Sequence, residues 1–236
     1  MGKQGKRYTD ASSRYDRDQM YSATEALDLA SSLAGAKFDE GIDLLVRLSV
    51  DPRKAEEMVR GTVALPSGTG KDVRVAVFAQ GEAANAAREA GADHVGGDDL
   101  AAEVEGGMLD FDVAISTTSA MKDVRQVARV LGPKGLMPNP KSGTVSDDIP
   151  KTIKEVKAGR VEFKMDKTAN IVVVVGKKSF SVQQLSENAA VALAALVKAQ
   201  PAGFAGGRFI KSLTLSASMS PGVNIDLKPY SAAVVA

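Results

Sequence analysis

Cationic side chains with aromatic or hydroxyl neighbours recur along the 236-residue sequence, and they are the residues best suited to bind phosphate. Arginine holds phosphate oxygens in pairs through its planar guanidinium, whereas lysine acts as a point charge. An aromatic ring can lie against a ribose or a base. These residue types predict binding of a nucleic acid. The candidates are Lys37, Phe38, Arg53, Lys54, Arg160, Lys164, Lys167 and Thr168.

Each of these candidates also has a simpler interpretation. Phe38 follows Gly35 and can equally be a core residue where a helix turns into a strand, and many of the cations can be ordinary solvated surface. Strand alternation directs Glu162 and Lys164 to one face and Phe163 to the other, which leaves an open polar face. We therefore expect Lys164 and Lys167 to be the most direct contacts.

A second group of candidates combines small polar residues with two carboxylates. Small side chains let backbone groups approach a ligand, hydroxyls can donate to phosphate, and a methionine can pack on a ribose. A carboxylate can accept from a 2′-hydroxyl or a base amino group. For Glu25, a capping box with Ser22 is the more direct interpretation. The group consists of Glu25, Glu40, Ser218, Met219 and Ser220.

The segment from Leu131 to Val145 interleaves prolines and glycines with lysines, so no regular helix or strand is expected to run through it. It resembles the signature segment of the ribosomal protein L1 family. From about Tyr21 to Asp226 the order and spacing are similar to that family. Other segments that carry the resemblance are Ala36–Glu40, Asp51–Lys54, Val59–Val63, Gly91–Gly97, Lys157–Phe163, Asp166–Thr168 and Ser218–Ser220.

The resemblance implies a cytoplasmic protein of the large ribosomal subunit that binds 23S rRNA at its mobile stalk. It further implies assistance in releasing deacylated tRNA from the E site and, in bacteria, repression of the chain's own operon through its mRNA. No cofactor, membrane or small-molecule partner is implied. In the family, the Lys37 corner and the Met219 turn face RNA. Here Ser220 stands in place of the family's glycine, and Gly41 stands where many members have threonine.

Composition argues against catalysis. The chain has no cysteine and one histidine, His94, so thiolate zinc sites, cysteine nucleophiles and histidine triads cannot be assembled from it. No dinucleotide fingerprint follows the apolar run Val73–Ala79, and Gly68–Asp72 departs from a P-loop. No apolar run approaches the roughly 20 residues that a membrane-spanning helix needs. A nucleotide-binding enzyme built on the middle segment and a DNA-binding protein remain the alternatives.

The net charge of +1 conceals an asymmetry. Residues 69–159 hold 11 Lys and Arg against 14 Asp and Glu, so 19 of the 30 basic and 15 of the 29 acidic residues lie elsewhere. Because neutralising phosphates dominates affinity for RNA, we expect the RNA-binding surface in the outer segments.

Periodicity predicts the elements that position these candidates. Helices are expected to begin at Ser22, at Asp51–Pro52 and at Ser181. Ile42–Val50 alternates as a strand, whereas Val161–Met165 and Ile171–Val175 are predicted to form a hairpin with a cationic tip. Between Val73 and Lys157, short apolar strands alternate with helices, which is typical of a parallel sheet flanked by helices.

The fold class is therefore a combination of α/β and α+β with two domains. Residues 1–68 and 160–236 are expected to form a split RNA-binding α+β domain. Residues 69–159 are expected to form an inserted, Rossmann-like, three-layer α/β domain. Gly68, Gly70 and Gly159 are the predicted hinge.

Overall fold

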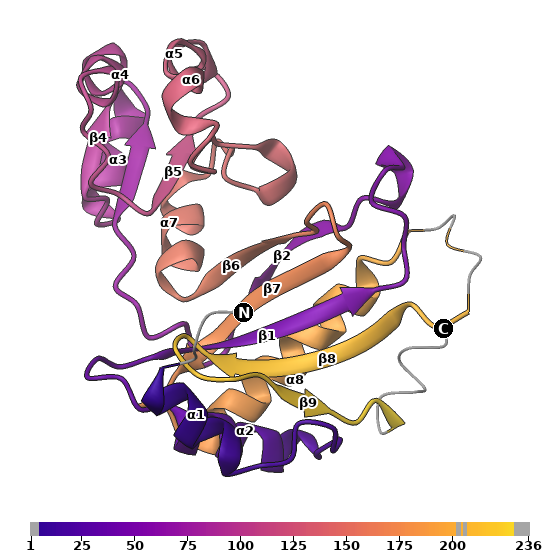
Figure 1. Ribbon diagram of the computed structural model, residues 1–236. Helices are drawn as coiled ribbons and strands as arrows, with labels where there is room; N and C mark the ends of the chain where they lie inside the picture. The colour runs from indigo at the N-terminus through magenta and orange to yellow at the C-terminus, as the bar shows by residue number, and fades with distance from the viewer. Residues whose placement is uncertain (1–4, 202–203, 205–206, 229–236) are drawn as a thin grey trace. The chain divides into compact units, whose positions relative to one another are not determined.

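The computed structural model describes residues 5–201, 204 and 207–228 (Figure 1). The chain divides into two compact units, one made of Met1–Gly70 with Val161–Ala236 and the other of Lys71–Arg160. We call them the split unit and the inserted unit. Their limits lie within two residues of the boundaries that the sequence predicts.

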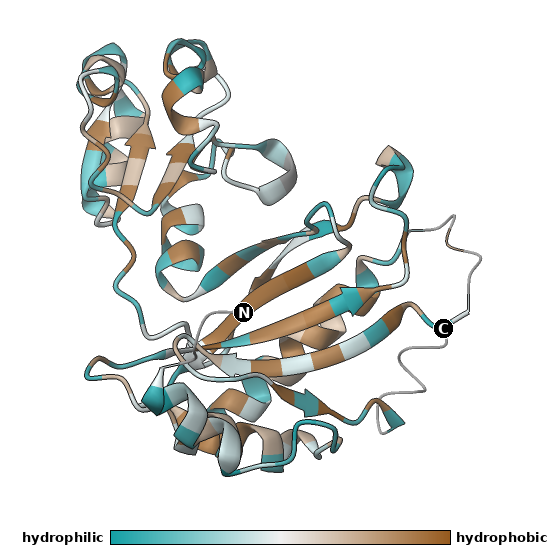
Figure 2. Cartoon of the chain, in the orientation of Figure 1, coloured by the Kyte–Doolittle hydropathy of each residue, from teal (hydrophilic) through white to brown (hydrophobic). Residues whose placement is uncertain are grey.

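The split unit is built on a four-stranded sheet of order β7-β1-β8-β9, whose neighbouring strands are all antiparallel. In β1, buried Ile42, Leu44 and Val46 alternate with more exposed residues. Apolar residues colour much of these strands brown in Figure 2. The strands are β1 (Gly41–Leu48), β7 (Asn170–Lys177), β8 (Ile210–Ala217) and β9 (Val223–Ile225).

Two amphipathic helices, α2 (Ala23–Leu33) and α8 (Val182–Lys198), pack on one face of this sheet. Both begin with the capping boxes that the sequence predicts, because the side chains of Ser22 and Ser181 accept from the backbone three residues later. A shorter helix, α1 (Lys6–Ser13), precedes them and was not expected from the sequence.

Two local predictions in the split unit are wrong. Strand β6 (Arg160–Lys164) pairs with β2 (Arg60–Ala64) in a separate sheet, so β6 and β7 do not form a hairpin. The absence of a side chain at Gly61 makes room for the Phe163 ring, because a Cβ added at Gly61 would lie 2.7 Å from that ring. After Asp51–Pro52 the chain forms only the short 3-10 helix η1 (Ala55–Glu57).

The inserted unit contains the expected parallel sheet, in the order β4-β3-β5. Helices α3 and α7 pack against one face and α4 and α5 against the other, which gives three layers. The expected helix after Met121 is interrupted at Val127. The elements are β3 (Val75–Phe78), α3 (Glu82–Glu89), β4 (His94–Gly96), α4 (Asp98–Glu105), β5 (Val113–Ser116), α5 (Met121–Gln126), α6 (Ala128–Leu131) and α7 (Ile149–Lys157).

The Leu131–Val145 segment contains no strand or α-helix beyond Leu131, as predicted. It includes the 3-10 turn η2 (Pro140–Ser142) and returns to the sheet where Val145 bridges Ser116 of β5. Among the described residues, no helix has the length and apolar character needed to cross a membrane.

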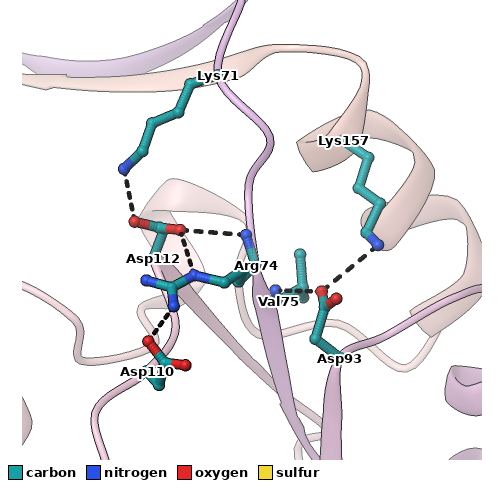
Figure 3. A network of polar contacts seen from close by, with 7 residues as sticks. All are labelled: Lys71, Arg74, Val75, Asp93, Asp110, Asp112 and Lys157. Carbon is teal, nitrogen blue, oxygen red and sulfur yellow. Dashed lines mark hydrogen bonds and ion pairs between the residues drawn. The ribbon is translucent and has the colours of Figure 1, made fainter.

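Ion pairs hold the amino-terminal ends of the parallel strands together (Figure 3). Lys71 Nζ lies 2.5 Å from Asp112 Oδ1, and Arg74 pairs with both Asp110 and Asp112. The hydrogen bond from Lys71 is the main cause of a lowered pKa at Asp112. These contacts fix the loop before β3 against the loop before β5.

A second part of the same network lies at Asp93, which precedes β4 (Figure 3). Its Oδ2 accepts from the backbone N–H of Val75 at 2.8 Å and lies 3.4 Å from Lys157 Nζ of α7. The hydrogen bond from the Val75 N–H is the main cause of a lowered pKa at Asp93, and the charge of Lys157 contributes less. The cations of this network are therefore already neutralised within the unit.

Candidate nucleic-acid interface

Glu40 joins the two loops that the sequence singles out at the start of β1. Its side chain is completely buried. One carboxyl oxygen accepts from the backbone N–H of Ala36 at 2.6 Å, and the other accepts from the backbone N–H of Met219 at 2.9 Å. Because each oxygen already has a protein donor, Glu40 positions the two loops relative to each other.

Phe38 and Met219 lie on the loops that Glu40 connects, and both are exposed, at 56% and 53%. The core interpretation of Phe38 is therefore wrong. Lys37, next to this ring, is exposed as well. Two large apolar side chains held in water beside a lysine form a surface that can pack on ribose or base.

Ser218 fastens the Met219 turn to the first residue of β1. Its backbone N–H donates to the Gly41 carbonyl at 3.0 Å, and the N–H of Gly41 donates to the Ser218 hydroxyl at 3.1 Å. The backbone N–H and the hydroxyl of Ser218 are thus already hydrogen-bonded within the protein, and its expected RNA contact remains a prediction.

Ser220 fits this turn without strain, since among the described non-glycine residues only Ala169 has a positive φ. Its hydroxyl donates to the Leu33 carbonyl of α2 at 3.0 Å. A glycine could not make that bond. At Gly41, an added Cβ would lie 3.5 Å from the Ser218 hydroxyl oxygen, an ordinary contact, so the site has room for a larger residue.

Glu25 is exposed and completes the capping box of α2. Its Oε2 accepts from the Ser22 backbone N–H at 3.0 Å and from the Ser22 hydroxyl at 2.8 Å. The Ser22 hydroxyl is the main cause of its lowered pKa. The structural role inferred for Glu25 is confirmed, and its role toward RNA remains a prediction.

Asp166 shapes the turn that presents Lys167. One of its oxygens accepts from the backbone N–H groups of Thr168 and Asn170, each at 2.8 Å, and the Thr168 hydroxyl donates to the same carboxyl. The Asn170 N–H contributes most to the lowered pKa of Asp166. Lys164 and Lys167 are both exposed, and Phe163 points into the core as the alternation predicts.

The candidates do not form one compact cluster on the RNA-binding surface expected in the outer segments. Gly41 pairs with Lys177 at one end of the sheet, whereas Arg47 pairs with Asn170 at the other. Six strand residues separate the two ends, or roughly 20 Å. The Lys167 turn therefore lies at the end opposite Phe38 and Met219, because β7 runs antiparallel to β1.

The sheet face away from α2 and α8 connects these two ends. Val172 and Val174 of β7 are exposed on it at 52% and 38%. Strand β8, which lies on the other side of β1, contributes half-buried hydroxyl residues at alternate positions. Those hydroxyl residues are Ser212, Thr214 and Ser216. The face offers apolar and hydroxyl contacts along the whole length of the strands.

A cavity of about 520 Å³ lies at the Lys167 end of this face. It brings three cations, Arg47, Arg208 and Lys211, together with Thr168 and Pro52. None of these three cations was predicted to be a site residue. The alternation of β1 does direct Arg47 to the uncovered face, but its nearness to Arg208 depends on strand pairing that no local pattern reveals.

The remaining candidates have more varied surroundings. Arg53 is exposed, whereas Lys54 Nζ lies 2.8 Å from Glu57 Oε1. Arg160 is only partly exposed and pairs with Glu155 at 2.8 Å, so its charge is offset within the inserted unit, to which both residues belong. RNA phosphate would have to compete with Glu155 for the charge of Arg160.

The three glycines expected at the crossings all have positive φ, with values of 67° at Gly68, 69° at Gly70 and 102° at Gly159. Other residues rarely adopt this conformation, which accounts for glycine at these positions. Whether they act as a hinge remains a prediction.

Comparison with known proteins identifies the family. The model of the ribosomal protein L1p/L10e family matches residues 30–221. The chain belongs to the ribosomal protein L1 family. This family of ribosomal proteins is structural and not enzymatic. The residues matched by the family model include Lys37, Phe38, Lys167 and Met219, whereas Glu25 lies outside the matched range.

Curated relatives of this L1 chain match nearly its whole length. The large ribosomal subunit protein uL1 of Cutibacterium acnes is 52% identical, covering 95% of this chain and 96% of the relative. Its counterpart from a Nocardioides species is 49% identical, covering 94% and 92%. That of Corynebacterium glutamicum is 48% identical, covering 96% and 95%.

Proposed function

We propose that this L1 chain is a structural constituent of the large ribosomal subunit and binds 23S rRNA at the mobile stalk through its split unit. The observation that carries the proposal is that exposed Phe38 and Met219 lie on two loops that buried Glu40 joins. The names of the curated relatives support the assignment to the large subunit.

The uncovered sheet face extends the proposed interface toward Lys167 and Arg47. Ribose and base contacts at the Phe38 end would determine the fit to a folded RNA, and the cations at the other end would neutralise phosphates. In this proposal residues 1–68 and 160–236 form the RNA-binding domain. Residues 69–159 form the inserted domain, which Gly68, Gly70 and Gly159 connect as a hinge.

Two further roles belong to the same proposal because the family resemblance implies them. The first is contact with E-site tRNA, through which the protein assists release of the deacylated molecule. The second is repression of its own operon through the mRNA. Repression requires only that the mRNA mimic the ribosomal binding site. One protein surface then serves both the 23S rRNA and the mRNA.

Substitution of Lys167 tests the interface directly. In filter-binding titrations against the stalk fragment of 23S rRNA at several salt concentrations, Lys167→Ala is expected to weaken binding. It should also reduce the slope of log K against log salt by about one, since one phosphate contact is lost. Lys198→Ala, which removes an exposed lysine from the end of α8, is the matched control. An unchanged slope for Lys167→Ala would remove Lys167 from the interface.

A further inference from the structure

The inserted unit has a segregated charge distribution that its overall acidity conceals. Residues 82–112 carry nine Asp and Glu against one basic residue, Arg88. Residues 113–145 carry five Lys and Arg against one acidic residue, Asp123. The acidic stretch includes α3, β4 and α4, and the basic stretch includes α5, α6 and the proline-rich loop (Figure 1).

The basic stretch presents its cations on one side of a helical segment. Lys122, Arg125 and Arg129 are spaced by three and four residues, so they share one face of α5 and α6. The apolar residues Val124, Val127 and Leu131 have the same spacing on the opposite face and are buried against the sheet. All three cations are exposed, and so is Lys134 in the turn that follows.

These cations differ from several others in the described part of the inserted unit in lacking a salt bridge. Within the described part of the chain, Lys122, Arg125, Arg129 and Lys134 form no salt bridge. Asp123, the only acidic residue nearby in sequence, accepts instead from Gln80 Nε2 at 3.2 Å. By contrast, Lys71, Arg74, Lys157 and Arg160 all pair with carboxylates.

We propose that Lys122, Arg125, Arg129 and Lys134 form a second RNA-binding surface, which takes the phosphate backbone of an RNA other than the one held by the split unit. Exposed cations that form no salt bridge gain most from a partner with closely spaced negative charges. The acidic stretch repels the same partner, so the charge separation orients the inserted unit toward it. Both phenylalanines of the inserted unit, Phe78 and Phe111, are buried, which favours recognition of backbone over base.

The test uses the full chain saturated with the 23S stalk fragment, to which a fluorescein-labelled RNA hairpin of unrelated sequence is added. The variant Lys122→Gln/Arg125→Gln/Arg129→Gln is compared with Arg88→Gln/Lys151→Gln/Lys154→Gln. The control variant loses the same charge from α3 and α7, which pack on the other face of the sheet. Thermal unfolding establishes that both variants are folded.

We expect the first variant to bind the hairpin about tenfold or more weakly at about 0.1 M salt, with a salt slope lower by two to three. Its affinity for the stalk fragment and all properties of the control should stay unchanged. An unchanged hairpin affinity, or an equal loss in the control, would overturn the proposal.

Lysine acylation of the wild-type chain, read by mass spectrometry, gives a second test that needs no variant. The hairpin is expected to protect Lys122 and Lys134 while Lys151 and Lys154 stay reactive, and equal reactivity at all four would overturn the proposal. If the stalk fragment fails to bind, the proposed function fails, but protection by the hairpin still decides this inference.

Discussion

At the scale of single residues, the most consequential side chain is one that a ligand cannot reach. Glu40 was a candidate RNA contact, yet it is buried and gives one oxygen to each of two loops. The exposed residues Phe38 and Met219 are then arranged by a carboxyl group beneath them. A buried polar group with both acceptors satisfied specifies one arrangement of the loops, because any other would leave a donor unpaired.

Glu40→Gln is therefore expected to destabilise the protein by about 2 to 3 kcal/mol and to weaken binding of the 23S fragment. The amide nitrogen of glutamine would face a backbone N–H of Ala36 or Met219, so one of the two bonds is lost. Urea unfolding and filter binding measure the two effects. Glu162→Gln, at an exposed position of β6, serves as the control and should change stability by less than about 0.5 kcal/mol. Equal stabilities of the two variants would show that Glu40 does not hold the loops.

At the scale of elements, pairing of strands distant in sequence decides where the candidate residues lie. Strand β6 joins β2, while β7 joins β1, and the turn between them carries Lys167 to the far end of the four-stranded sheet. The contact between Gly61 and Phe163 accompanies the first of these pairings. Glycine at that position is thus a packing requirement, since its backbone shows no positive φ.

Gly61→Ala is expected to destabilise the split unit by about 1 to 3 kcal/mol, because the new methyl group would overlap the Phe163 ring. Gly41→Ala gives the matched comparison within another strand. There the added Cβ meets only ordinary contacts. Alanine has less conformational freedom to lose on folding than glycine, so the substitution is expected to stabilise the split unit by about 0.5 to 1 kcal/mol. Denaturant midpoints measure both changes. The opposite order of stabilities would contradict the packing described for β2 and β6.

At the scale of the whole molecule, two units with separate cores share one chain. The split unit has a single core cluster, and the inserted unit has one cluster on each face of its parallel sheet. A unit of this size with its own core is able to fold alone. The two units also differ in charge pattern, because the inserted unit carries, on α5, α6 and the loop after them, a group of exposed cations that form no salt bridge with any described residue.

Residues 71–160 expressed alone are expected to unfold cooperatively, because both faces of their sheet remain covered. They should bind the 23S stalk fragment no more tightly than a hairpin of unrelated sequence, since Phe38, Lys167 and Met219 all lie in the split unit. Calorimetry and filter binding measure the two properties. A chain in which a short Gly-Ser linker joins residue 70 to residue 161 is the complementary control and should bind. A preference of the isolated inserted unit for the stalk fragment over the unrelated hairpin would move the 23S interface there.

Residue patterns were sufficient to predict the features that depend on near neighbours. Capping boxes at Ser22 and Ser181, burial alternation in β1 and the strand-helix succession of the inserted unit all follow from contacts within a few residues. The family, too, was recognisable from motifs in sequence order. The burial of Glu40 and the distance between Lys167 and Met219 became apparent only in the folded chain. Those outcomes depend on which distant strands pair and in which direction, and local residue patterns do not encode that choice.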